Sequence, residues 1–170
     1  MTERESFHIE PMNQKPILFN GEMIRAILDG RKTMTRRVIK YKLLNPKCFN
    51  GIWRETGCDD TVHFYLKNKY GNPGDFLWVK GTFYMPHHAS RINLKITETR
   101  IERLQDITLN DCFAEGLPLG TVESDGIEPY KYDRCLIFQF SKLWDSINAK
   151  RGYGWEKNPW VWCISFKMGD

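Results

Sequence analysis

Residues 91–103, RINLKITETRIER, decide the fold class of this chain. Within them the apolar residues Ile92, Leu94 and Ile96 alternate with polar ones. A period of two places successive side chains on opposite faces of a strand, so this stretch predicts a long β-strand with one face in water. Clusters of β-branched and aromatic residues predict four further strands, at 38–39, 61–66, 76–84 and 160–167. The chain is therefore expected to be rich in sheet.

Three helices are expected between these strands. The first spans 22–29 and follows Asn20, a residue type that caps helix N-termini. Its apolar stripe, which we expect to be buried, consists of Met23, Ile24, Ile27 and Leu28. The other helices are expected at 108–115 and 135–149. Because strands outnumber helices and the crossover pattern of a doubly wound sheet is absent, we expect an α+β fold that is mostly β, built as a small β-barrel decorated by short helices.

The length of 170 residues suits one domain. Residues 1–14 are polar and lack a hydrophobic period, which predicts a flexible N-terminal arm in front of a single domain over 15–170. Inside that domain, Pro, Gly and polar residues indicate an irregular excursion over 43–60 and a mobile loop over 118–133.

The composition also indicates the cellular compartment in which we expect the protein. No apolar run approaches the roughly 18 residues that a membrane-spanning helix needs, and the first ten residues, MTERESFHIE, are too polar for a signal peptide. The five cysteines are odd in number and widely spaced, as is typical of reduced thiols. We therefore expect a cytoplasmic protein that does not bind membranes; its oligomeric state is left open.

Positive charge is concentrated in one short segment. Residues 31–42, RKTMTRRVIKYK, contain six basic residues and no acidic one, whereas the whole chain has a net charge of only +4. Such a patch attracts phosphate groups and steers anionic partners. The alternative interpretation is a solvated, positively charged strand or loop.

Two sequence motifs stand in order along the chain, GRKTMTR at residues 30–36 and GNPGDFLWVKGTF at residues 71–83. They resemble the G-x-K-x-x-T-R signature and the G-x-P-G-D-x-L-W-V segment of ASCH domains, a family related to the PUA fold. Residues 96–108 together with the Ala-Glu-Gly at 114–116 match a third stretch. The end of the chain, 140–166, resembles the longer members that phages and prophages carry. One departure is Gly81, which stands where the family pattern has an acidic residue.

The resemblance implies a PUA-like barrel with a cleft that binds RNA or a modified pyrimidine nucleoside. Some members hydrolyse N4-acetylcytidine and related N4-acylcytidines with a Lys, a Thr and a Glu, which fall here on Lys32, Thr35 and Glu115. Two other functions stay open: a non-catalytic RNA-binding module, such as a phage or prophage regulator, and, less favoured, a ribonuclease. The sequence therefore leaves open whether the protein is an enzyme.

The amidohydrolase chemistry is physically reasonable for these three residues. The Thr35 hydroxyl would be the nucleophile, and Lys32 the base, because burial and the neighbouring arginines lower the pKa of a lysine. Glu115 at a raised pKa would protonate the leaving amine. The plain alternative is a solvated lysine, a strand threonine and the last residue of a helix.

Further side chains are candidates for holding the substrate or nucleic acid. The basic ones are Arg31, Arg36, Arg37 and Lys40, and the aromatic ones are Tyr153 and Trp155 in a Gly-rich loop. Packing of that loop against the protein explains the two rings equally well. No cofactor or metal is expected, because the sequence contains no C-x-x-C pair and no phosphate-binding Gly-rich loop.

Overall fold

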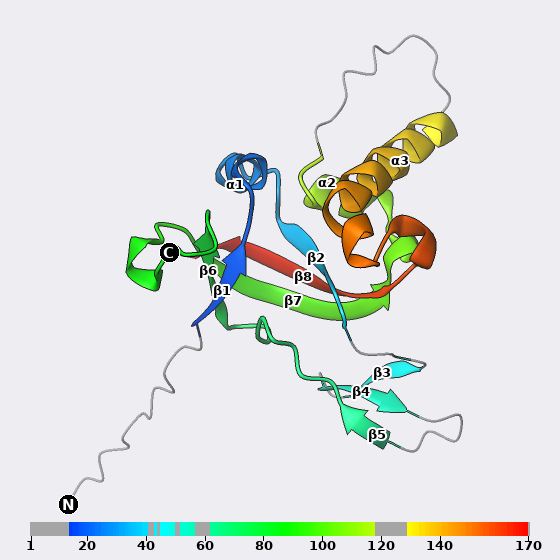
Figure 1. Cartoon of the computed structure of the whole chain (residues 1–170), viewed down its shortest axis with the longest axis horizontal. Helices are drawn as coiled ribbons and strands as arrows, with labels where there is room; N and C mark the ends of the chain where they lie inside the picture. Colours follow the sequence, from blue (N-terminus) through cyan, green and yellow to red (C-terminus); the bar gives the residue numbers. More distant parts are fainter. Residues whose placement is uncertain are drawn as a thin grey trace, which may run out of the picture.

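A five-stranded mixed sheet forms the centre of the molecule in the computed structural model (Figure 1). The structure describes residues 14–40, 43, 45–49, 52–56, 62–117 and 129–169. In spatial order the strands are β1 (Gln14–Leu18), β6 (Phe76–Lys80), β7 (Asn93–Arg103), β8 (Trp160–Met168) and β2 (Met34–Val38). β1 is parallel to β6, and the other neighbours are antiparallel. The α+β, mostly β class is thus confirmed.

The sheet is open rather than closed. β1 and β2 stand at its two ends, and no ladder joins them within the described ranges. The small closed barrel expected from the sequence is therefore not confirmed. β2 is an edge strand, and this position matters for the site described below.

β7 keeps its alternating pattern only as far as a bulge. Leu94 and Ile96 are buried and Lys95 is exposed, as the period of two predicts. The register with β8 then shifts between Ile96 and Glu98. A bulge inserts one extra residue and turns the following side chains to the opposite faces. As a result, Ile101 faces the same core as Leu94.

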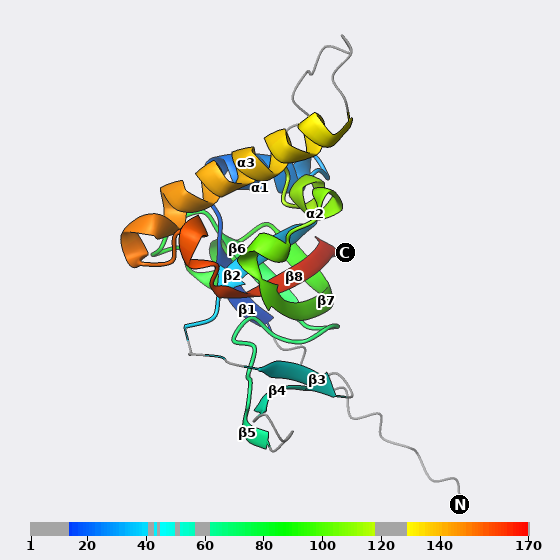
Figure 2. The ribbon, with the colours of Figure 1, turned by 90° about the vertical axis from the view of Figure 1, so that its right-hand side faces the viewer.

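Apolar clusters cover both faces of the sheet. On one face, Phe19, Leu77 and Ile164 belong to a core against which α1 (Gly21–Leu28) packs through Ile27. On the other, α2 (Leu109–Ala114) and α3 (Pro129–Asn148) cover β8 (Figure 2). Short 3-10 helices occupy His87–Ala89, Leu104–Asp106, Ala149–Arg151 and Trp155–Lys157.

The stripe expected on α1 is only partly buried. Ile27 is 2% exposed, and Met23 and Ile24 pack partly against the core. Leu28, however, is 59% exposed, because the buried face of this two-turn helix is centred on Ala26 and Ile27. The expectation that Leu28 is buried was wrong.

Residues 43–60, which the composition marks as irregular, contain two strands. β3 (Pro46–Phe49), β4 (Ile52–Thr56) and β5 (Val62–Tyr65) form a separate three-stranded antiparallel sheet. Phe49 pairs with Ile52, so the two strands are joined by the dipeptide Asn-Gly, the strongest short hairpin signal in a sequence. The ring of Trp53 meets that of Trp162 edge-on at 6.3 Å, which ties this sheet to the main core.

Other boundaries differ from the expected ones by several residues. The strand from residue 76 ends at Lys80 rather than at Tyr84. Most of the expected arm, 1–13, and residues 118–128 of the expected loop lie outside the described residues, while 129–133 belong to α3. None of the described helices has the length and apolar character needed to span a membrane.

Candidate functional site

A pocket of about 520 Å³ opens along the edge of β2. α1 contributes Met23, the second half of α3 contributes Phe140 and Trp144, and the segment before β6 contributes Tyr70. Among the described residues that line the pocket, five carry a cationic side chain and one, Glu115, carries a carboxylate. The cations are Arg36, Arg37, Lys40, Lys69 and Arg151.

Thr35 lies in the wall of this pocket, on the edge strand. The residue is 4% exposed, and its hydroxyl has no hydrogen-bond partner among the described residues. Thr33 and Ile39 use backbone groups to bond β8. In an antiparallel ladder such bonds recur at every second residue, so the intervening Arg36 directs its backbone N–H and C=O away from β8, to the open edge.

Lys32 and Glu115 form a buried ion pair beside the pocket. The Lys32 ammonium donates to Glu115 Oε2 at 2.7 Å and to the Glu115 carbonyl oxygen at 2.8 Å. Burial lowers the pKa of Lys32, and Arg37 and Arg36 act in the same direction, while Glu115 opposes the shift. Two of the three expected catalytic residues are therefore in direct contact. Lys32 itself is not among the residues that line the pocket.

Gly116 explains why the pair can form. A bridge joins the backbones of Lys32 and Glu115 at the end of α2. Gly116 has φ +84°, and a Cβ there would lie 2.8 Å from the Cβ of Lys32. Only glycine combines this left-handed backbone with so close an approach. The Ala-Glu-Gly motif thus has a packing reason.

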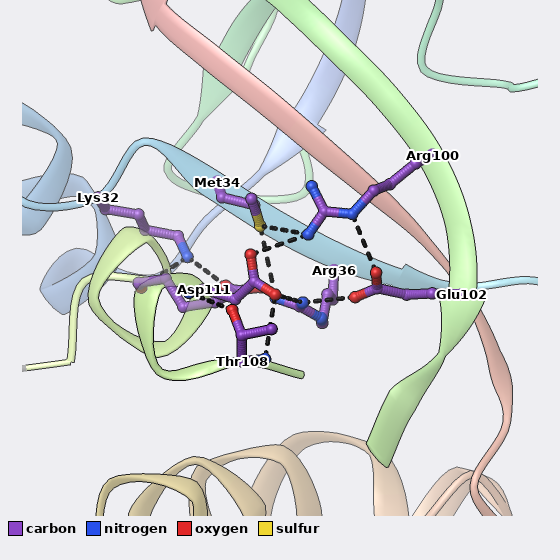
Figure 3. A network of polar contacts seen from close by, with 8 residues as sticks. Lys32, Met34, Arg36, Arg100, Glu102, Thr108 and Asp111 are labelled. Carbon is purple, nitrogen blue, oxygen red and sulfur yellow. Dashed lines mark hydrogen bonds and ion pairs between the residues drawn. The ribbon is translucent and has the colours of Figure 1, made fainter. Parts of the chain in front are cut away.

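Arg36 is part of a buried polar network rather than a free binding group (Figure 3). Its guanidinium contacts the carboxylates of Glu102, Asp111 and Glu115, the last two at 2.9 and 3.3 Å. Arg100 completes the network by donating to Asp111 at 2.8 Å and to Glu102 at 2.9 Å. Arg36 and Arg100 flank Cys163 in register, so they project from the same face of the sheet.

The charges of this network balance. Lys32, Arg36 and Arg100 face three carboxylates, those of Glu102, Asp111 and Glu115. Burial alone would raise the pKa values of Glu102 and Asp111, but hydrogen bonds and the two arginines hold both below their usual values. Buried charges are tolerated when they are paired in this way. Lys32 and Arg36 are consequently not available to neutralise the charge of a ligand.

Four cations of the pocket do remain uncompensated in the described part of the chain. Arg37 donates to the Leu18 carbonyl oxygen at 2.8 Å and lies 5.0 Å from the Phe19 ring centroid, without a carboxylate partner. Lys40 and Arg151 are exposed at the rim, and Lys69 lies over the ring of Tyr70. Arg31, by contrast, pairs with Asp29 outside the pocket. The sequence interpretation missed Lys69 and Tyr70, which come from a segment distant from β2.

The two candidate aromatic residues are placed differently. Tyr153 lines the pocket, and its carbonyl oxygen accepts a hydrogen bond from Trp144 Nε1 at 2.7 Å. Trp155 instead packs edge-on against Phe140 at 6.1 Å, within the second apolar cluster, and is not a pocket-lining residue. Trp155 therefore has a packing role here.

Two further sequence observations concern metals and Gly81. Among the described residues, no three His, Cys, Asp or Glu side chains are grouped so that they could hold a metal ion. At Gly81 a Cβ would meet only Ile24 Cδ1, at 3.7 Å, so a side chain would fit. Packing therefore does not account for the missing acidic residue.

No family model matches this chain, and no curated protein matches it. Three solved structures are similar over most of its length. Hypothetical protein PH0355 is 14% identical, with a TM-score of 0.49 over 92% of this chain and 99% of that one. An ASCH domain from Lactobacillus crispatus JV V101 is 12% identical, with a TM-score of 0.43 over 92% and 79%. The DUF984 protein EF3133 from Enterococcus faecalis V583 is 12% identical, with a TM-score of 0.49 over 95% and 78%. With all three scores below 0.5, these similarities establish neither family nor function.

Proposed function

We propose that the pocket along β2 binds a pyrimidine nucleotide of single-stranded RNA, or a modified pyrimidine nucleoside. The observation that carries the proposal is the set of four uncompensated cations around a pocket of about 520 Å³. Ligand pockets are usually about 300–1,000 Å³ in volume. Arg37, Lys40, Lys69 and Arg151 provide charge for phosphate groups.

The remaining lining suits a nucleobase. Tyr70 and Tyr153 are among the residues that line the pocket, and a base that stacks on an aromatic ring gains about 1–3 kcal/mol. The Thr35 hydroxyl and the outward backbone groups of Arg36 offer donors and acceptors for the edge of a base. The four ASCH-like motifs of the sequence support the same interpretation.

Salt dependence tests the binding proposal. Four phosphate contacts predict a slope of about −2.8 for log affinity against log salt with a single-stranded RNA. Replacing Lys40 and Arg151 by Ala should reduce that slope by about 1.4, because two contacts are lost. The matched control replaces Lys142 and Lys167, two exposed lysines that do not line the pocket. RNA affinity that is insensitive to salt, or equally reduced in the control, would contradict the proposal.

One observation favours a catalytic version, the hydrolysis of N4-acylcytidine. Thr35 and Glu115 line the same pocket, and the Thr35 hydroxyl has no hydrogen-bond partner in the part of the chain that the structure describes. A proton moved from Lys32 Nζ to Glu115 Oε2 gives a neutral amine and a carboxylic acid with no change in net charge. In the proposed reaction the Thr35 hydroxyl oxygen attacks the acyl carbon of the substrate. The hydroxyl proton passes to the neutral amine of Lys32. The C–N4 bond then breaks, the carboxylic acid protonates the leaving nitrogen, and water hydrolyses the acyl-threonine.

Cytidine release from N4-acetylcytidine decides between the enzyme and the non-catalytic binding module. Thr35→Ala should abolish release, Thr35→Ser should retain part of it, and Lys32→Arg should be nearly inactive, because an arginine cannot supply a neutral amine. Thr33→Ala is the matched control, since Thr33 is exposed and does not line the pocket. No release at high protein concentration would leave the binding module. Release abolished by a chelator would instead indicate a metal mechanism.

A further inference from the structure

A second pocket adjoins the first. It has a volume of about 360 Å³ and lies against β1, the end of β6 and the loop that follows β6. Lys69 and Tyr70 line both pockets, so the two pockets adjoin at these residues.

Cationic and aromatic side chains line the second pocket. Lys15, Lys69 and Lys80 line it, and none of the described residues that line it is acidic. Within the described residues, these three lysines have no carboxylate partner. The Lys80 ammonium lies 5.4 Å from the centroid of the Phe83 ring and donates to the Phe83 carbonyl oxygen. Cations next to aromatic rings suit a single nucleic-acid strand, because its phosphate groups alternate with bases.

The aromatic side chain of Phe83 is exposed to solvent. Its residue is 72% exposed, and Tyr84, which meets it edge-on at 5.3 Å, is 90% exposed. Large apolar groups left open beside a charged groove mark interaction sites more often than isolated exposed residues do. A nucleobase stacked on Phe83 would cover such a ring and leave its phosphate near Lys80.

We propose that the second pocket is a subsite for the neighbouring nucleotide, so that the ligand is a single-stranded oligonucleotide rather than a free nucleoside. The proposal rests on the proposed function, because it takes the first pocket as the primary nucleotide site. In this arrangement, Lys15 and Lys80 bind the phosphate of the neighbouring nucleotide, and the Phe83 ring stacks on its base. Tyr70 and Lys69 lie where the two pockets adjoin.

The experiment compares cytidine 5′-monophosphate with the dinucleotide CpC and a hexacytidylate, each displacing a fluorescein-labelled hexamer from the full chain. The hexamer and the dinucleotide should bind more tightly than the monophosphate. The double variant Lys15→Ala/Lys80→Ala should lower the salt slope for the hexamer by about 1.4 and leave monophosphate binding unchanged. Phe83→Ala should weaken hexamer and dinucleotide binding by about 5- to 150-fold, the loss of one stacked base.

Lys95→Ala is the matched control for Lys80. Lys95 stands on the neighbouring strand β7, 5.9 Å from the centroid of the Phe76 ring, and lines neither pocket. The subsite is overturned if the dinucleotide binds no better than the monophosphate, or if Lys15→Ala/Lys80→Ala acts no more strongly than Lys95→Ala. It is equally overturned if Phe83→Ala has no effect, since the second pocket would then be only an anion patch. If cytidine 5′-monophosphate still binds in these cases, the proposed function stands without the subsite. If none of the three ligands binds, the subsite and the proposed function are both overturned.

Discussion

The buried pair of Lys32 and Glu115 supports a quantitative prediction about stability. Glu115→Gln keeps the shape of the side chain and an oxygen acceptor but removes the negative charge. Lys32 is 2% exposed, so water cannot replace the lost partner. At 2.7 Å and an effective dielectric constant of about 20, the Coulomb attraction is about 6 kcal/mol. Measured losses on removing one partner of a buried pair are about 3–5 kcal/mol.

Denaturant unfolding monitored by tryptophan fluorescence measures this loss. We expect the free energy of unfolding to fall by about 3–5 kcal/mol, out of about 5–15 kcal/mol for a typical domain. Asp29→Asn is the control, because it breaks the exposed pair with Arg31, which is worth at most about 1 kcal/mol. Adding Lys32→Met to Glu115→Gln should restore most of the stability, since no buried charge is then left unpaired.

The pH dependence of the Glu115→Gln variant separates an unpaired charge from a simple packing defect. Burial lowers the pKa of Lys32 in the folded protein, and Glu115 no longer opposes this shift in the variant. The unfolded chain then binds more protons than the folded one up to about pH 10.4, so stability rises with pH in that window. A deficit below about 1 kcal/mol at neutral pH, or one that grows as the pH is raised, would refute the reasoning.

The other predictions concern the packing of α1 in the core and the stability of the fold at acid pH. Ile27→Ala should lower the free energy of unfolding by about 2–5 kcal/mol, and Leu28→Ala, on the exposed side of the same helix, by no more than about 0.5 kcal/mol; equal denaturation midpoints would contradict this placement of α1. Because Glu102 and Asp111 have lowered pKa values in the folded protein, their contribution should be complete above about pH 4 and decline as the pH falls through those lowered values. An acid titration followed by circular dichroism should show this decline shallower in Glu102→Gln, and an unchanged profile would show that the network does not stabilise the fold.

Local pattern was enough to predict most secondary structure. The alternation at 91–103 predicted β7, and Thr108 and Asn20 each cap the helix that follows them, because these effects depend only on near neighbours in sequence. The Asn-Gly dipeptide in the sequence between β3 and β4 equally predicts their antiparallel pairing, but the sequence interpretation assigned residues 43–60 to an irregular excursion. The basic segment 31–42 and the order Lys32, Thr35, Glu115 were likewise visible in the sequence.

Tertiary structure decided which of those charges are free. Arg36 and Arg37 are adjacent and identical in type, yet only Arg36 enters the carboxylate network, because neighbouring residues of a strand point to opposite faces. The bulge after Ile96 determines that Arg100 and Glu102 reach the same network, and no period in the sequence marks it.

Contacts between distant segments determined the rest of the site. Lys32 and Glu115 are 83 residues apart, and the pocket brings Lys69 and Arg151 to the edge of β2. A sequence gives the spacing of such residues along the chain. Their desolvation and their pairing arise only once the sheet and its helices have packed together.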